Sequence, residues 1–305
     1  MKHSIPITFI LICMFIGAQI LGLFVIQSYH PPLPEPIIIN ETVIQTHEIR
    51  ELPMGIERPE IEENTAWLYI IIAILIGTGL LLALIKMNAV AVTKVWFFLA
   101  WFIALTIAFN AFLPQIIAIA LAIIIAGLRV IRNNTLVQNV SEMFIYGGIA
   151  ALMYSIISIF AAIMLIIAIA IYDMIAVWKS KHMITLANYQ TNQNMFAGIH
   201  IPYKTNKIPT QRKSHTYTEK NAKRTKSARK TTAAILGGGD IAFSLIFASA
   251  IMKSYTFLYA LIPIGTATIA LTLLFIFAQK GKMYPAMPFI GAGCLVGLGI
   301  VMLIA

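Results

Sequence analysis

Charged residues are scarce in this chain: lysine, arginine, aspartate and glutamate make up only 11% of its 305 residues, while 59% are hydrophobic. With a mean hydropathy of +0.85, this composition excludes an ordinary soluble globular protein and indicates a membrane protein. The long apolar stretches match the roughly 20 residues that a helix needs to cross a bilayer. They lack the alternation of a membrane β-barrel, so an all-α structure is expected.

Cysteine is nearly absent as well. Cys13 and Cys294 both lie within apolar stretches, and neither has a neighbour at the spacing of a disulfide framework or a metal site. The sequence therefore predicts no disulfide and no bound metal. The first apolar stretch is longer than the core of a signal peptide and has no clear cleavage motif, so we interpret it as a retained span, with cleavage as the alternative.

The apolar stretches predict an all-α polytopic membrane protein with about nine transmembrane helices. Two of them, 95–128 and 140–178, are too long for one ordinary crossing. Asn110 and Pro114 mark a turn in the first, and a turn near 154–158 divides the second. The predicted spans are 5–26, 67–85, the two halves of 95–128, the two halves of 140–178, 232–252, 255–278 and 283–304.

The basic residues orient these spans through the positive-inside rule. With nine spans and a cytoplasmic N-terminus, nineteen of the 22 lysine and arginine residues face the cytoplasm, and only Arg50, Arg58 and Lys253 lie outside. The C-terminus is then extracytoplasmic. We expect a multi-pass protein of the cell membrane.

The chain divides into three parts on this basis. Residues 1–178 carry spans 1 to 6 with an acidic external loop at 27–65, residues 179–230 form a basic cytoplasmic loop expected to be flexible, and residues 231–305 carry spans 7 to 9. The basic loop has twelve lysine and arginine residues and one acid, Glu219. Orientation and attraction to anionic lipid both explain such a loop, so we predict membrane lipid and no nucleic acid as its partner.

Aspartate occurs only twice, and both copies lie inside predicted spans, Asp173 in span 6 and Asp240 in span 7. Because an acid at the centre of a membrane helix costs roughly 3 kcal/mol, such an acid is a functional candidate. No lysine or arginine falls within the predicted spans to neutralise the pair, so the expected partner of each aspartate is the other one or water. A structural hydrogen bond between helices is the alternative.

Two carboxyls held close together share a proton and divide into an acid and a base. One then activates water while the other polarises a peptide carbonyl, which is the chemistry of an aspartic protease and needs no cofactor. Gly237, Gly238 and Gly239 leave space for the backbone of an unwound substrate, although packing between helices also explains them. The segment YPAMP at 284–288 is on its own a helix start or a kink.

Together these motifs resemble the presenilin and signal peptide peptidase family of intramembrane aspartyl proteases, especially its microbial, archaeal members. Tyr172 and Asp173, the GGGD ending at Asp240, and the PAMP of 285–288 are similar to the family's YD, G-x-G-D and P-A-L-P motifs in order and in span number. With the large loop between spans 6 and 7, the resemblance covers nearly the whole chain. At Met287 and at the x position of G-x-G-D the family often has leucine, and the second departure bears on substrate preference.

The resemblance implies that Asp173 and Asp240 are the catalytic pair and that no metal or cofactor takes part. The substrate-binding and supporting residues that it implies are Tyr172, Gly237, Gly238, Gly239, Pro285, Ala286 and Met287. The expected substrates are transmembrane helices of other proteins in type I orientation. Obligatory auxiliary subunits are not expected, and a homo-oligomer is left open.

Three other readings compete with the protease. A proton-coupled transporter also uses intramembrane carboxylates as a proton relay, but it predicts repeated halves and further polar residues along a path, and neither is evident. Prepilin peptidases resemble this chain in a G-x-G-D aspartate, yet they lack the span 9 motif and the nine-span plan. A non-catalytic scaffold leaves both aspartates unexplained.

The nine-span orientation predicts the result of cysteine labelling in intact cells. Cysteines introduced at Ser214 and Ser227 are expected to react only from the cytoplasmic side, and one introduced at Thr46 only from outside, because the basic residues divide 19 to 3 between the two sides. The reverse labelling pattern would invert the orientation and with it the substrate class.

Overall fold

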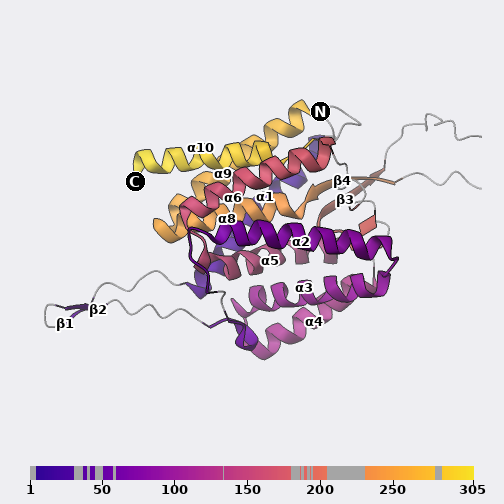
Figure 1. The fold of residues 1–305 in the computed structure, drawn as a ribbon, viewed down its shortest axis with the longest axis horizontal. Coiled ribbons are helices and arrows are strands. Elements are labelled where there is room, and N and C mark those ends of the chain that lie inside the picture. The colour runs from indigo at the N-terminus through magenta and orange to yellow at the C-terminus, as the bar shows by residue number, and fades with distance from the viewer. Residues whose placement is uncertain are drawn as a thin grey trace, which may run out of the picture.

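The computed structural model describes residues 5–30, 37–39, 42–44, 51–57, 60–132, 134–179, 186, 189–190, 193, 195–204, 231–278 and 284–305. This described part of the chain is a bundle of nine helices whose long axes run in broadly the same direction (Figure 1). The helices are α1 (Ile5–Tyr29), α2 (Ala66–Lys86), α3 (Val90–Asn110), α4 (Gln115–Ile131), α5 (Thr135–Met153), α6 (Ile159–Met174), α8 (Gly238–Ser254), α9 (Phe257–Phe277) and α10 (Met287–Ile304).

Short elements connect or extend these helices. Two antiparallel hairpins, β1 with β2 and β3 with β4, are the only sheets among the described residues. The short elements are β1 (Ile37–Ile39), β2 (Thr42–Ile44), β3 (Gly198–Lys204), β4 (Thr231–Gly237), the 3₁₀ turns η1 (Pro53–Gly55) and η2 (Tyr154–Ile156), and the π-helical turn η3 (Ile175–Lys179).

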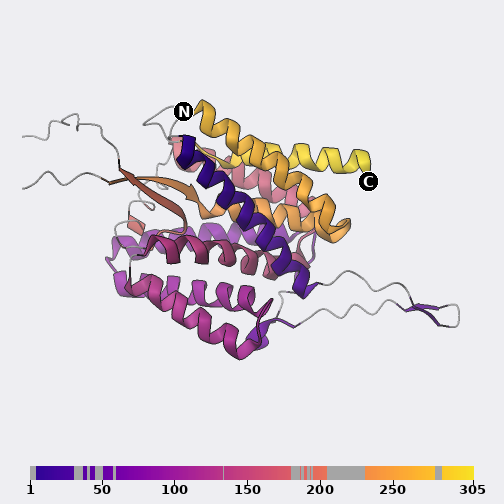
Figure 2. The same ribbon diagram turned by 180° about the vertical axis from the view of Figure 1, so that it is seen from behind.

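Helix α8 lies at the centre of the bundle. It contacts α1, α5, α6, α9 and α10, and most of its side chains are buried. Helices α3 and α4 pack together along one edge of the bundle, and α9 and α10 pack together along the opposite edge (Figures 1 and 2). Large apolar side chains point away from the bundle, as a hydrocarbon solvent allows; Ile116 and Leu303 are 84% and 86% exposed.

The predicted helices are confirmed, including both helical hairpins. Helix α3 ends at Asn110 and α4 begins after Pro114, while η2 separates α5 from α6 near residue 155. Among the described residues, seven helices are long and apolar enough to cross a membrane. The other two, α4 and α8, have 17 residues each, which is the lower end of the range for a membrane-spanning helix.

The predicted start of span 7 is wrong, because residues 231–237 form strand β4 instead of the first turns of a helix. The strand pairs along its whole length with β3, with Gly198 opposite Gly237 and Lys204 opposite Thr231. Its sequence, TTAAILG, is apolar enough to pass for part of a span, but its threonine and isoleucine residues also suit a strand. A partner strand that is distant in sequence decides between the two.

Span 9 also begins later than predicted, at Met287 instead of residue 283. Pro285 and Ala286 precede the helix, and Pro288 lies in its first turn, where a missing N–H group costs no helical hydrogen bond. The predicted residues 279–283 lie outside the described residues, as does most of the basic loop that was predicted to be flexible.

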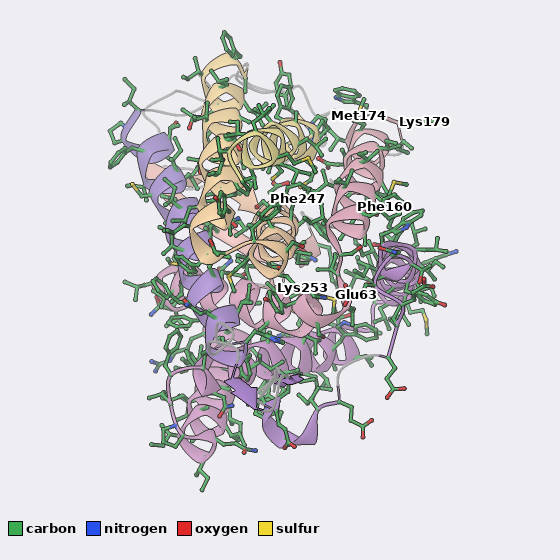
Figure 3. The ribbon with its side chains drawn as sticks, turned by 90° about the vertical axis from the view of Figure 1, so that its left-hand side faces the viewer. Glu63, Phe160, Met174, Lys179, Phe247 and Lys253 are labelled. Carbon is green, nitrogen blue, oxygen red and sulfur yellow. The ribbon has the colours of Figure 1, made fainter. Side chains whose placement is uncertain are left out.

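The two ends of the bundle carry different attachments. The N-terminus and the β3–β4 hairpin lie at one end, and the C-terminus and the β1–β2 hairpin lie at the other (Figures 1 and 2). At the second end Lys253 Nζ lies 2.7 Å from Glu63 Oε1 and donates to Ser155 O at 2.9 Å (Figure 3). This grouping agrees with the alternation of nine spans, while the identity of the cytoplasmic side stays a prediction.

Helices α3 and α5 approach each other closely at Gly148, so a larger residue there is expected to lower stability. A Cβ at Gly148 would lie 2.0 Å from the backbone oxygen of Ala104, which cannot move aside as a side chain could. We expect Gly148→Ala to destabilise the detergent-solubilised protein by about 1–3 kcal/mol, seen as a lower Tm. Gly127→Ala, in open space on α4, is the matched control and is expected to leave the Tm unchanged. Equal Tm values for the two variants would contradict the packing.

Candidate active site

Asp173 lies near the end of α6, on the side that faces the bundle. The helix begins at an N-cap, Ser158, whose Oγ accepts a hydrogen bond from Ala161 N at 3.2 Å, and an apolar run carries it to Asp173. The side chain is buried, with the residue only 6% exposed. An aspartate carboxylate at such a site needs hydrogen-bond donors, because little water reaches it.

The donors come from the N-terminus of α10. Met287 N donates to Asp173 Oδ2 at 3.2 Å, and the backbone N–H of Ala286 also hydrogen-bonds to this carboxylate. The first N–H groups of a helix have no partner within the helix, and the helix dipole favours a negative charge beside them. The segment PAMP therefore supplies backbone donors to one of the two aspartates.

Asp240 lies in the first turn of α8, two residues after the helix begins. Its own carbonyl accepts a hydrogen bond from Ser244 Oγ at 2.8 Å, and its carboxylate interacts electrostatically with that of Asp173. Helices α6 and α8 are in direct contact. The structure thus brings the only two aspartates of the chain together from separate helices.

The three glycines before Asp240 differ in their surroundings. A Cβ at Gly237 would lie 3.1 Å from Asp240 Oδ2, and one at Gly239, which is exposed, would make only ordinary contact with Phe243 at 3.5 Å. A Cβ at Gly238 would meet Tyr146 Oη at 2.7 Å. The space beside Gly238 is therefore filled by the protein itself, so packing accounts for a glycine at this position.

Tyr172 extends toward a different helix from its neighbour in the YD motif. Its hydroxyl donates to Thr78 Oγ1 on α2 at 3.5 Å, whereas the Asp173 carboxylate faces α10. Adjacent residues on a helix point about 100° apart, so one of the two can face the site while the other packs sideways. Tyr172 thereby links α6 to the peripheral helix α2.

A buried ion pair beside the site was not predicted. Arg129 lies within α4 and is 5% exposed, and its Nη2 donates to Oε1 of Glu142, which is 1% exposed. The expectation that no basic residue lies within a span is wrong at this point, since α4 continues to Ile131. Arg129 is paired with Glu142. The contacts described above for Asp173 and Asp240 include no basic side chain. The position of Glu142 inside predicted span 5 was the one sequence feature that pointed to such a pair.

Tyr146 and Gln19 also lie at the site without having been predicted. The Tyr146 hydroxyl donates to Glu142 Oε2, one helical turn away. Gln19 of α1 is fully buried, and its Nε2 donates to Ile241 O at 3.0 Å and to Ser244 Oγ at 2.5 Å, both on α8. A lone glutamine in the apolar first span was a signal for a contact between helices, but its partner cannot be read from the sequence.

The described residues hold no group of three or more histidine, cysteine, aspartate or glutamate side chains that could bind a metal ion. The functional groups that meet here are two carboxyls, the N-terminal N–H groups of α10 and the backbone around Gly237 and Gly238. This set can exchange protons with a water molecule and a peptide carbonyl, as an aspartic protease requires.

Comparisons with known proteins agree with this geometry. A family model described as "Signal-peptide peptidase, presenilin aspartyl protease" matches residues 38–305. Two solved structures, each of a presenilin family intramembrane aspartate protease, one in space group C222 and one in P2, have a similar fold. Their TM-scores are 0.63 and 0.62, with 16% and 17% identity, over 98% and 99% of this chain and 99% of each of theirs. No curated protein gives a significant match to the sequence.

Proposed function

The chain belongs to the signal-peptide peptidase and presenilin family of aspartyl proteases, and we propose that it hydrolyses peptide bonds within transmembrane helices of other membrane proteins, with Asp173 and Asp240 as its catalytic pair. The observation that carries this proposal is the meeting of the only two aspartates of the chain inside a bundle of apolar helices. Two acids placed where burial is costly need a function that uses both.

The reaction needs one proton between the two carboxyls. The ionised carboxylate takes a proton from water as the water oxygen attacks the scissile carbonyl carbon, and the protonated carboxyl donates to the carbonyl oxygen. The resulting tetrahedral intermediate collapses as the C–N bond breaks: the carboxyl that took the water proton gives it to the leaving nitrogen, and the other carboxylate takes a proton back from a hydroxyl of the intermediate as the carbonyl reforms. Hydrogen bonds from Ala286 and Met287 keep the Asp173 carboxylate oriented during these transfers.

The substrate must be extended at the cleaved bond, because a helical peptide has its carbonyls occupied. Strand β4 runs into Gly237 and Gly238 and ends three residues before Asp240. One edge of β4 pairs with β3, and no other described strand pairs with its second edge. An unwound substrate can add to such an edge through backbone hydrogen bonds, which would carry its carbonyl toward the aspartates.

Both aspartates are expected to be essential. Asp173→Asn and Asp240→Asn should each lower cleavage of a transmembrane peptide by at least about 10²–10⁴-fold, because an amide cannot exchange the proton. The fragments are measured by mass spectrometry on purified protein, and Tm and elution volume serve as controls for folding. Cleavage by either variant at the wild-type rate would rule out the pair as catalytic. Proton-coupled solute uptake lost in both variants, without any peptidase activity in the wild type, would support a transporter.

A shared proton also predicts the pH dependence. Cleavage rate against pH should be bell-shaped, because activity fails when the pair holds no proton and when it holds two. The measurement is the initial rate of peptide cleavage across the pH range in which the Tm is constant. A curve with a single limb would contradict a shared proton, because only one ionisation would then control the rate.

A transition-state mimic tests the same pair by binding. A peptide isostere with a hydroxyl in place of the scissile carbonyl should bind tightly to the wild type. Either asparagine variant should weaken its binding by a similar factor, and the double variant should lose little more, because both groups hold one hydroxyl. Additive losses in the double variant would place the two aspartates in separate sites.

A further inference from the structure

Gly238, the residue between the last position of β4 and the rest of α8, lies in a slot with two walls. On one side are Tyr146 Oη and Cε1, which a Cβ at residue 238 would approach to 2.7 and 3.1 Å. On the other side is Ala197 O, at 3.2 Å from the same point, which also accepts a hydrogen bond from Gly238 N at 3.3 Å. Any side chain at this position would have to displace one of these walls.

The tyrosine wall is held firmly. Tyr146 is 3% exposed, and its hydroxyl donates to Glu142, which is itself paired with Arg129. The guanidinium of Arg129 lies 3.8 Å from the centre of the Trp101 ring and donates to Ser141 Oγ at 2.9 Å. Moving the phenol would leave Glu142 Oε2 without this hydrogen-bond donor, and a buried acceptor that loses its donor is destabilising.

The second wall is held by the same helix. Gln138 Nε2 donates to Phe196 O at 3.1 Å and to Gly198 O at 3.2 Å. Asn139 accepts from His200 N and donates to His200 O, both at 2.9 Å, in the manner of a neighbouring strand. Side chains of α5 therefore fix the segment that carries Ala197 as well as the phenol that faces it.

We propose that Tyr146 is a positioning residue of this protease: it occupies the side-chain space of residue 238 and, with the β3 segment opposite, fixes the backbone that leads into Asp240. The inference rests on the proposed function, because it assigns Tyr146 a part in holding Asp240 for catalysis. Only Gly239 separates the held Gly238 from Asp240, so a shift of the backbone at Gly238 also moves the carboxylate. Glu142 and Arg129 act through Tyr146 and touch neither the substrate nor the reacting atoms.

The test is a double-mutant cycle between residues 146 and 238, measured as kcat and KM for a transmembrane peptide. Gly238→Ala should lower kcat by about 10²-fold, because a displacement of about 1 Å at a catalytic group has an effect of this size. Tyr146→Phe alone should lower kcat roughly tenfold through the lost hydrogen bond. In the Tyr146→Phe background, Gly238→Ala should cost at least about fivefold less than in the wild type, since the closest atom has been removed. KM should stay within about threefold throughout.

Controls distinguish a positioning role from an effect on folding alone. The concentration of competent enzyme in each variant is counted by titration with the hydroxyl isostere, so kcat refers to folded sites only. A role in folding alone would leave this corrected kcat at the wild-type value. Gly265→Ala, in open space on α9, is the matched control and should retain wild-type kcat.

The outcomes distinguish this inference from the function on which it rests. A wild-type chain that cleaves no peptide would overturn the proposed function and the positioning role together. A wild-type chain that cleaves, with effects at 146 and 238 that simply multiply, would overturn the positioning role alone. A loss of kcat in the double variant that is smaller than the product of the two single losses supports the positioning role.

Discussion

A buried carboxylate in a hydrocarbon solvent needs hydrogen-bond donors, and the arrangement of the C-terminal part of this bundle follows from that need at Asp173. The N-terminus of α10 supplies donors from its unpaired backbone N–H groups. It reaches Asp173 because the helix begins only at Met287, after Pro285 and Ala286. Glycines on the same helix let it pack closely on α9: at Gly293 and Gly297 a Cβ would come within 3 Å of the backbone of α9.

Asp240 is placed by a different device. It lies at the start of the central helix, where the chain changes from a strand to a helix. Gln19 of α1 holds the first turn of α8 from one side, and Tyr146 of α5 limits the backbone at Gly238 from another. A carboxylate at a helix start is easier to reach than one in mid-helix, and the second edge of the preceding strand β4 has no partner among the described strands.

The ion pair of Arg129 and Glu142 connects the bundle to the β3–β4 hairpin. Its partners include the backbone of Phe196, and neighbouring polar side chains of α5 bind β3. On β3 itself, burial lowers the pKa of His200, so this imidazole stays neutral at neutral pH and the hairpin docks on α5 without a further charge. A complete polar network can remain buried in this way, whereas a single unpaired member could not.

The sequence by itself determined the nine helices and both helical hairpins, because these depend on the length of apolar runs and on turn residues. It also identified the two aspartates as candidate functional residues, because burying an acid in a membrane is costly. It did not determine that residues 231–237 are extended, since an apolar segment takes the form of the partner it meets, here β3. The late start of α10, the burial of Arg129 against Glu142, and the contacts of Gln19 and Tyr146 were likewise decided by tertiary structure. Each of them depends on contacts between different helices, and a local sequence pattern does not indicate which group on another helix will satisfy a buried polar atom.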